Sequence, residues 1–204
     1  MNTALIAEMV DMEWKMFSAT QNVGGQASCQ RDKRSFEIMR ASQFEAWDED
    51  SLESYCADLR SAEKAGLNLP TLKYAYMMES TDPAAYARIV HSLPPVSPEK
   101  REVVEALVAQ TVAWCEDFAS RWPAVAAAGR SIRSSTDSIY NTSVETYSRG
   151  EFSSYSMETL SCLRRHYDRL KAEGVNLHER IVERELRLQG AESLDDAERI
   201  MTRR

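Results

Sequence analysis

Glycine and proline are scarce in this chain, with seven and six occurrences among 204 residues. Alternation of β-branched and polar residues, the usual pattern of strands, is nearly absent as well. Glycine and proline disfavour helix interiors, and alternation is what a half-buried strand requires. A chain poor in both is expected to be mostly helical. The sequence therefore predicts an all-α protein.

Positive charge is also in deficit, because 25 lysines and arginines face 32 aspartates and glutamates and the net charge is −7. A general nucleic-acid binder needs a basic face, so we exclude nucleic acid as a partner. No apolar run approaches the length that crosses a membrane. The first segment, residues 3–18, has the pattern of an amphipathic helix and not of a signal peptide, which predicts a cytoplasmic protein.

Standard motifs for cofactors and metals are missing. The chain has no phosphate-binding glycine-rich loop, no dinucleotide fingerprint and no nucleophile elbow. Its three histidines are scattered, without cysteine or carboxylate at a ligand spacing. We therefore expect no cofactor and no metal site. Four cysteines fit the free thiols of a reducing compartment, and Cys29 is the one that lies off an apolar helical stripe.

The chain does contain one segment that occurs twice. Residues 36–81 align without a gap on residues 144–189. Gly66 and Gly174 fall at the same place in the two segments, and an asparagine follows each by two residues. Glycine commonly ends a helix and asparagine commonly begins one, so the two segments share their helix boundaries. The alternative is that helical hairpins of similar length simply look alike.

This duplication predicts one domain of two pseudo-symmetric helical repeats, spanning about residues 1–91 and 98–204. The proline-containing stretch 92–97 is the linker between them. Helical periodicity predicts that Phe36 and Met39 are buried on the second helix, and Arg40 is placed to pair with Glu37 one turn earlier. Helices are expected at about 3–18, 32–46, 49–65, 97–120, 143–150, 156–173 and 176–189. One more begins after 68, a short one runs from 82 to about 91, and a final one begins at 193.

Two polar loops occupy equivalent places in the repeats, and we name them the first loop (residues 19–31) and the second loop (residues 129–142). The second loop concentrates hydroxyl, guanidinium and amide groups, which suit a carboxylate or phosphate. In the first loop, glycines allow the backbone to approach a ligand closely. The alternative is a pair of solvated loops whose polar side chains only form turns and caps. The candidate ligand-binding residues are Asn22, Gly24, Gly25, Ser28, Gln30, Glu37, Arg130, Arg133, Ser134, Ser135, Tyr140, Asn141, Thr142 and Tyr147.

Three residues are candidates for catalysis. Cys29 precedes a helix, where a thiol becomes a better nucleophile. Asp137 and Glu145 are candidate bases, and Glu145 matches Glu37 of the first repeat. First-turn acids also simply stabilise a helix through its dipole, and this alternative remains open for Glu37 and Glu145.

The strings at residues 13–17 with 21–30, at 36–47 and at 133–147 together resemble a bacterial and archaeal family of unknown function, catalogued as domain-of-unknown-function family 4125. The resemblance covers nearly the whole chain, and the segment with Gly24, Gly25 and Cys29 is its most specific part. The family supplies no reaction. The resemblance implies that both loops belong to the family signature, which favours one shared site.

Two functions are consistent with these patterns. The first is a site between the repeats for a small polar, anionic metabolite, in a cofactor-free enzyme of lyase, isomerase or transferase type. The second is a helical module that binds a protein partner or a second copy of the chain, through an exposed apolar face at residues 74–78. The loop arginines distinguish the two, because only the first function requires them.

Overall fold

The computed structural model describes residues 2–21, 25 and 27–203, and within them the chain forms helices and no strand. The prediction of an all-α fold is confirmed. The helices are α1 (Thr3–Ala19), α2 (Lys33–Glu45), α3 (Glu49–Ala65), α4 (Leu69–Thr81), α5 (Pro83–Ile89), α6 (Pro98–Arg121), α7 (Pro123–Ala127), α8 (Val144–Ser154), α9 (Met157–Ala172), α10 (Leu177–Leu188) and α11 (Leu194–Thr202). The helix expected at 143–150 continues four residues further, to Ser154.

Short polar side chains fix where the helices begin. Each capping side chain accepts a hydrogen bond from the backbone N–H three residues later, which satisfies a donor that has no partner within the helix. These caps are local in sequence, which explains why the predicted helix starts agree closely with the structure. The capping residues are Asn2, Asp32, Asp48, Asn68, Asp82, Ser97, Ser143, Ser156, Asn176 and Ser193.

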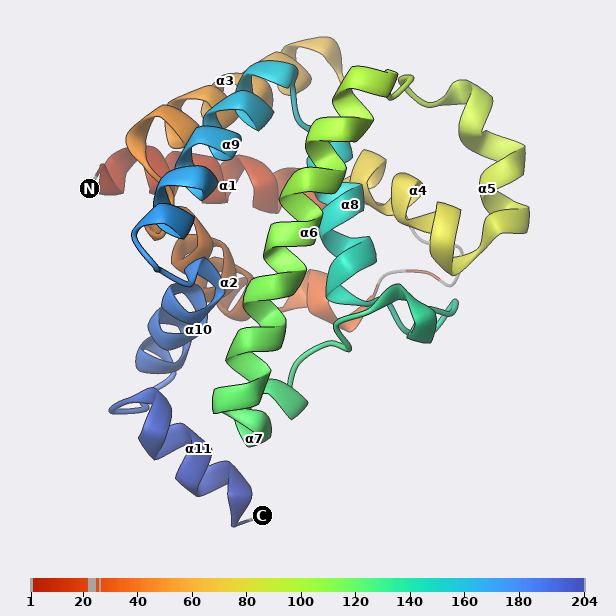
Figure 1. Ribbon diagram of the computed structural model, residues 1–204. Helices are drawn as coiled ribbons and strands as arrows, with labels where there is room; N and C mark the ends of the chain where they lie inside the picture. Colours follow the sequence, from red (N-terminus) through yellow and green to blue (C-terminus); the bar gives the residue numbers. More distant parts are fainter. Residues whose placement is uncertain (1, 22–24, 26, 204) are drawn as a thin grey trace.

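Figure 1 shows α6 as the long helix that crosses the molecule, with α3 and α9 side by side near one end of it. Helices α4 and α5 lie on one flank, and α10, α11 and α7 lie at the other end. A single main core collects apolar side chains from α1, α2, α3, α4, α6, α8 and α9. A smaller cluster around Phe118 and Leu194 fastens α11 to α6 and α7. None of the described helices is long and apolar enough to cross a membrane.

The helices pack in matched pairs. Helix α1 packs against α2, α3 and α4, while α6 packs against α8, α9 and α10. The repeats also exchange contacts, since α4 packs on α8 and α2 packs on α10. If α1, α2, α3 and α4 are exchanged with α6, α8, α9 and α10, in that order, the same set of contacting pairs results. The duplication stays a prediction, and the matched packing supports it.

The turns that follow α3 and α9 match in detail. Gly66 and Gly174 have φ of 66° and 67°. Asn68 then caps α4 and donates to the Met16 carbonyl of α1, at 2.6 Å. Asn176 caps α10 and donates to the Trp114 carbonyl of α6, at 2.9 Å. Asn68 therefore ties α4 to α1, and Asn176 ties α10 to α6.

Gly150 lies where α8 crosses α4. A Cβ atom at this position would lie 2.6 Å from Met77 Cγ and 2.7 Å from the Lys73 carbonyl oxygen. Alanine favours a helix over glycine by about 1 kcal/mol, but here the helix backbone of α4 would have to move. We therefore expect Gly150→Ala to lower the free energy of unfolding by about 1–3 kcal/mol, as measured by urea denaturation.

Gly129→Ala is the matched control for Gly150→Ala. The nearest atom to a Cβ at Gly129 is the Ala126 carbonyl oxygen at 3.4 Å, an ordinary contact. Its free energy of unfolding should stay within about 0.5 kcal/mol of the unchanged protein. Equal stability of the two variants would show that α4 and α8 do not pack as closely as described.

Candidate functional site

Four charged side chains are buried together in the main core, and we name them the buried ion cluster: Glu13 of α1, Arg40 of α2, Lys73 of α4 and Glu151 of α8. Their exposed fractions are 4%, 3%, 9% and 5%. Charged residues are almost never this deeply buried unless they are paired. A cluster that joins four helices therefore requires that its members satisfy one another.

Arg40 is the centre of the buried ion cluster. Its Nε and Nη2 atoms donate to the two carboxylate oxygens of Glu13, at 2.5 and 2.7 Å. Its Nη1 atom donates to Glu151 Oε1 at 2.9 Å and to Gln43 Oε1 at 2.7 Å. The guanidinium plane is thus held by two carboxylates from different halves of the chain, as its fork geometry allows.

Tyrosines complete the shell around these carboxylates. Tyr55 donates to Glu13 at 2.5 Å, and Tyr155 donates to Glu151 at 2.6 Å. The Lys73 ammonium donates to the Tyr147 hydroxyl at 2.7 Å and lies 3.7 Å from Glu151 Oε2. The two positive and two negative charges of the cluster therefore balance.

The environment fixes the protonation states of this cluster. Burial would raise the pKa of Glu151, but Arg40 and Lys73 outweigh it and lower that pKa to about 2. Burial would likewise lower the pKa of Lys73, but Tyr147 and Glu151 raise it above its ordinary value. At neutral pH Glu151 is therefore an anion and Lys73 a cation, and neither is available for proton transfer.

A cavity of about 140 Å³ opens beside the buried ion cluster. Glu13, Arg40 and Lys73 line it, together with apolar rings from α1 and α2. Cys29 of the first loop and Arg130 of the second loop line the same cavity. We name it the inter-loop cavity. The residues that line it are Glu13, Phe17, Cys29, Phe36, Met39, Arg40, Pro70, Lys73, Tyr74, Arg130 and Tyr147.

A larger hollow of about 520 Å³ adjoins the inter-loop cavity, and we name it the apolar groove. The two share Met39, Arg130 and Tyr147 as lining residues. The rest of the groove is formed mostly by apolar side chains of α6, α7, α8, α10 and α11. Its one histidine, His178, is neutral at pH 7 because burial lowers its pKa to about 4. The inter-loop cavity and the apolar groove therefore meet at Met39, Arg130 and Tyr147.

Tyr147 contacts two cations, Lys73 and Arg130. The Lys73 Nζ atom lies 4.3 Å from the centre of the Tyr147 ring, and the Arg130 guanidinium carbon lies 4.9 Å from it. Both distances fit cation–π contacts. Arg130 also donates to the Thr142 carbonyl at 3.3 Å. The ring therefore positions Arg130 at the mouth of the inter-loop cavity.

Three of the residues expected from the sequence come together here: Cys29, Arg130 and Tyr147. Cys29 is exposed, whereas the other three cysteines are buried. The first loop and the second loop therefore each contribute a side chain to one cavity. Two other expected residues, Asn22 and Gly24, lie outside the described residues.

The remaining expected residues before α3 lie elsewhere. Gln30 is buried and holds the first loop in place, because its Nε2 atom donates to the carbonyls of Phe17 and Thr20 at 2.9 and 2.7 Å. Ser28 and Gly25 are exposed, and Gly25 has a φ of 88°. Glu37 is an ion-pair partner of Lys33 on the surface of α2.

Asp137 and Glu145, the two candidate bases, fasten the second loop. Asp137 accepts hydrogen bonds from Ser80, Ser143 and Thr146, at 2.6, 2.7 and 2.5 Å. Burial acts to raise its pKa, but these bonds outweigh it and lower the pKa. Glu145 accepts from the Ser134 N–H at 2.9 Å and pairs with Arg149. Neither lines the inter-loop cavity, and their catalytic role stays a prediction.

The other candidate residues of the second loop do not line the inter-loop cavity. Arg133 pairs with Glu116 of α6 at 2.6 Å. Asn141 donates to Ser131 and Thr136 within the loop. Tyr140 is 92% exposed. Ser134, Ser135 and Thr142 also lie outside the cavity lining.

Two expectations about α2 are wrong. Arg40 does not pair with Glu37, because it faces inward to Glu13 and Glu151. Met39 is not buried: it is 37% exposed, because it lines the inter-loop cavity and the apolar groove. An apolar side chain that lines a cavity has the same sequence pattern as one that fills a core.

The buried ion cluster was missed, although the sequence carries a signal for it. Each of its charged residues lies between apolar or aromatic residues at a spacing of four. Arg40 lies between Phe36 and Phe44, and Lys73 lies between Leu69 and Met77. Such a spacing places the charge on the buried stripe of its helix. A charged residue in the middle of an apolar stripe therefore indicates a buried charge.

Within the described part of the chain, no three histidine, cysteine, aspartate or glutamate side chains come together to hold a metal ion. Comparison with curated proteins and with solved structures found no match. One protein family does match, over residues 3–199, and its description is a protein of unknown function, DUF4125. This agrees with the resemblance of both loop segments. The chain therefore belongs to the DUF4125 family.

Proposed function

We propose that this protein binds a small amphipathic organic anion, with its charged group in the inter-loop cavity and its apolar part in the apolar groove. The observation that carries the proposal is the charge of Arg130. The buried ion cluster is internally neutral, whereas Arg130 has no ion-pair partner among the described residues. One positive charge at the mouth of a cavity favours an anion.

The apolar groove determines the rest of the ligand. Its volume of about 520 Å³ lies within the range of small-molecule sites. Phe118, Val182 and Leu186 contribute apolar surface to it. An anion without an apolar part would leave this surface in contact with water, whereas a carboxylate with an alkyl or aryl group would cover it. The proposed ligand class is therefore an amphipathic carboxylate.

We extend the proposal to catalysis through Cys29. Lys73 is fixed as a cation, both oxygens of Glu13 are held by Arg40 and Tyr55, and burial raises the pKa of Tyr74 to about 12, so it keeps its proton. Among the lining groups this leaves the exposed thiol of Cys29 as the candidate nucleophile. A cofactor-free lyase, isomerase or transferase step remains the proposed reaction type.

The alternative function, a protein-binding module, required an exposed apolar face at residues 74–78. Tyr76 and Met77 are buried, with exposed fractions of 8% and 7%. The Tyr76 hydroxyl also donates to the Pro94 carbonyl at 2.7 Å. This segment therefore offers little apolar surface to a partner, and we prefer the small-molecule site.

Arg130→Gln should weaken the binding of 4-phenylbutyrate by about tenfold or more, because a charge-assisted hydrogen bond contributes about 1.5–3 kcal/mol. Arg133→Gln is the matched control: it removes the same charge from the same loop, but its partner is Glu116. Its affinity should be unchanged. Titration calorimetry with both variants, and with the uncharged 4-phenylbutyramide, measures the difference.

The same ligand should protect Cys29. Because the other three cysteines are buried, iodoacetamide is expected to alkylate Cys29 first, and mass spectrometry can follow that rate. Saturating 4-phenylbutyrate should slow the reaction if the ligand fills the inter-loop cavity. Equal affinity of the Arg130 and Arg133 variants, together with an unchanged alkylation rate, would refute the proposal.

A further inference from the structure

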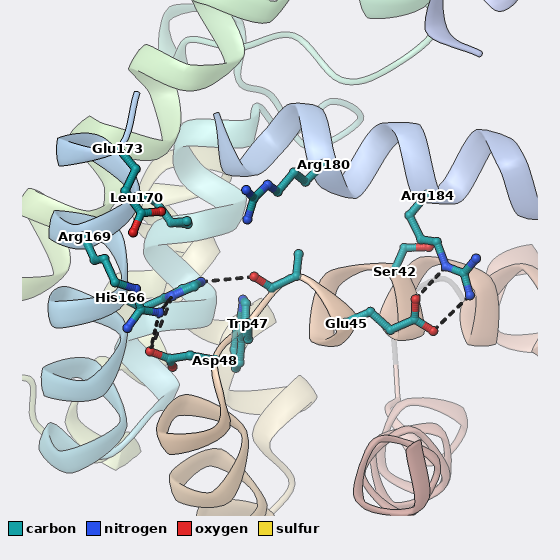
Figure 2. Close-up of a pocket in the computed structure, with 11 residues that line it drawn as sticks. Ser42, Glu45, Trp47, Asp48, His166, Arg169, Leu170, Glu173, Arg180 and Arg184 are labelled. Atoms are coloured by element: carbon teal, nitrogen blue, oxygen red, sulfur yellow. Dashed lines mark hydrogen bonds and ion pairs between the residues drawn. The ribbon is translucent and has the colours of Figure 1, made fainter. Parts of the chain in front are cut away.

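A third space, of about 420 Å³, lies between the α2–α3 turn, the end of α9 and one face of α10 (Figure 2). We name it the arginine hollow. It shares no lining residue with the inter-loop cavity. Trp47, Ala46 and Leu170 give it an apolar part, and Arg169, Arg180 and Arg184 surround it. Its size suits a small molecule.

Two of these arginines are already neutralised. Arg184 holds Glu45 with both Nε and Nη2, at 2.5 and 3.2 Å. Arg169 donates to Asp48 at 3.0 Å. Figure 2 shows both pairs at the edges of the arginine hollow. They form its walls, and they leave no net charge there.

His166 adds no charge to the arginine hollow either. Its Nε2 atom lies 3.0 Å from the Ala46 carbonyl, and its Nδ1 atom lies 2.8 Å from Arg169 Nη2. A ring between a carbonyl and a guanidinium donates from Nε2 and accepts at Nδ1, which is the neutral form. Burial lowers its pKa as well. The imidazole therefore stiffens the wall without contributing charge.

One cation and one anion of the arginine hollow remain unmatched. Among the described residues, Arg180 and Glu173 form no ion pair or side-chain hydrogen bond, although both line the hollow. Figure 2 shows the Arg180 guanidinium directed toward the space above Trp47. Glu173 caps the end of α9, where the helix dipole favours a positive charge. The buried Ser42 hydroxyl, also in the lining, has no hydrogen-bond partner within the described part of the chain.

We infer that the arginine hollow binds a small zwitterion, of the class of a free amino acid with an apolar side chain. Arg180 takes the carboxylate through its two-pronged donor geometry. Glu173 and the carbonyl end of α9 take the ammonium group. The side chain of the ligand lies against Trp47 and Leu170. This site is independent of the amphipathic anion proposed for the inter-loop cavity.

Three probes of one shape test this inference: L-leucine, 4-methylpentanoate, which lacks the amino group, and isopentylamine, which lacks the carboxylate. The readout is the indole N–H resonance of Trp47 in a ¹H–¹⁵N spectrum during titration. Leucine should shift this resonance saturably. Each single-charge probe should bind about tenfold or more weakly, because each loses one charge-assisted contact.

Two variants and two controls complete the test. Arg180→Gln and Glu173→Gln should each weaken leucine binding by about tenfold or more, and both residues are exposed, so folding should be unaffected. Arg187→Gln and Glu183→Gln remove charges that pair with each other on α10, and they should leave binding unchanged. No shift of the Trp47 resonance with leucine would overturn the inference. Equal binding of 4-methylpentanoate, with no effect of Glu173→Gln, would overturn the zwitterion.

Discussion

Replacing Arg40 with alanine is expected to lower the free energy of unfolding by about 3–5 kcal/mol, the usual cost of leaving a buried charge without its partner. Arg40 is 3% exposed and holds both Glu13 and Glu151. Its removal leaves two buried carboxylates near each other with Lys73 as their one remaining buried cation. Urea denaturation followed by circular dichroism measures the loss.

Arg34→Ala is the control for this prediction, because Arg34 lies on the same helix but is exposed. Its cost should not exceed about 0.5 kcal/mol. Arg40→Lys should fall between the two, since it keeps the charge but loses the two parallel bonds to Glu13. If Arg40→Ala and Arg34→Ala were equally stable, the buried ion cluster would not exist as described.

The helices could be predicted because their signals are local. Asn68 caps α4 and Asn176 caps α10 within three residues of themselves, and Gly66 and Gly174 end the preceding helices through a positive φ. None of these features depends on residues far away in the sequence. The end of α8 was misplaced at Gly150, because a glycine usually weakens a helix. Here it is the close approach of α4 that requires a glycine.

The partners of the buried ion cluster could not be predicted, because they are distant in sequence. Arg40 and Glu151 are 111 residues apart, and Arg40 and Glu13 are 27 apart. The pairing of residues three or four apart on a helix predicted Glu37 as the partner of Arg40, and this prediction was wrong. Only the packing of α2 on α1 and α8 decides which carboxylates the guanidinium meets.

For the candidate site, the sequence pointed to two loops, and three of the expected side chains line the inter-loop cavity. Cys29 and Arg130 do line one cavity, as the two-loop hypothesis required. Asp137 and Asn141, however, mainly hold the second loop together. A loop rich in hydroxyl and amide groups has the same composition whether these groups bind a ligand or one another. Lys73 comes from α4, outside both loops, and was not considered.

Acidification is expected to destabilise the protein by about 3 kcal/mol between pH 4.5 and pH 2 through Glu151 alone. Its pKa is about 2 in the folded protein and 4.5 in its ordinary state. The unfolded chain therefore takes up this proton at a higher pH than the folded protein does. The stabilisation is fully present above pH 4.5 and is lost as the pH falls through this window. Urea denaturation at a series of pH values measures it.

Glu151→Gln isolates this contribution. The variant should be less stable at pH 7, because Arg40 and Lys73 lose a buried counter-charge, but its stability should fall less steeply below pH 4.5. Parallel profiles for Glu151→Gln and the unchanged protein below pH 4.5 would mean that the Glu151 carboxylate is not held by Arg40 and Lys73.

His178 acts in a separate pH window. Its pKa of about 4 means that stability also falls from pH 6.5 toward pH 4, because the unfolded chain binds that proton at a higher pH than the folded protein does. His178→Gln should flatten the stability profile between pH 6.5 and pH 4 and leave the window below pH 4.5 that depends on Glu151 unchanged.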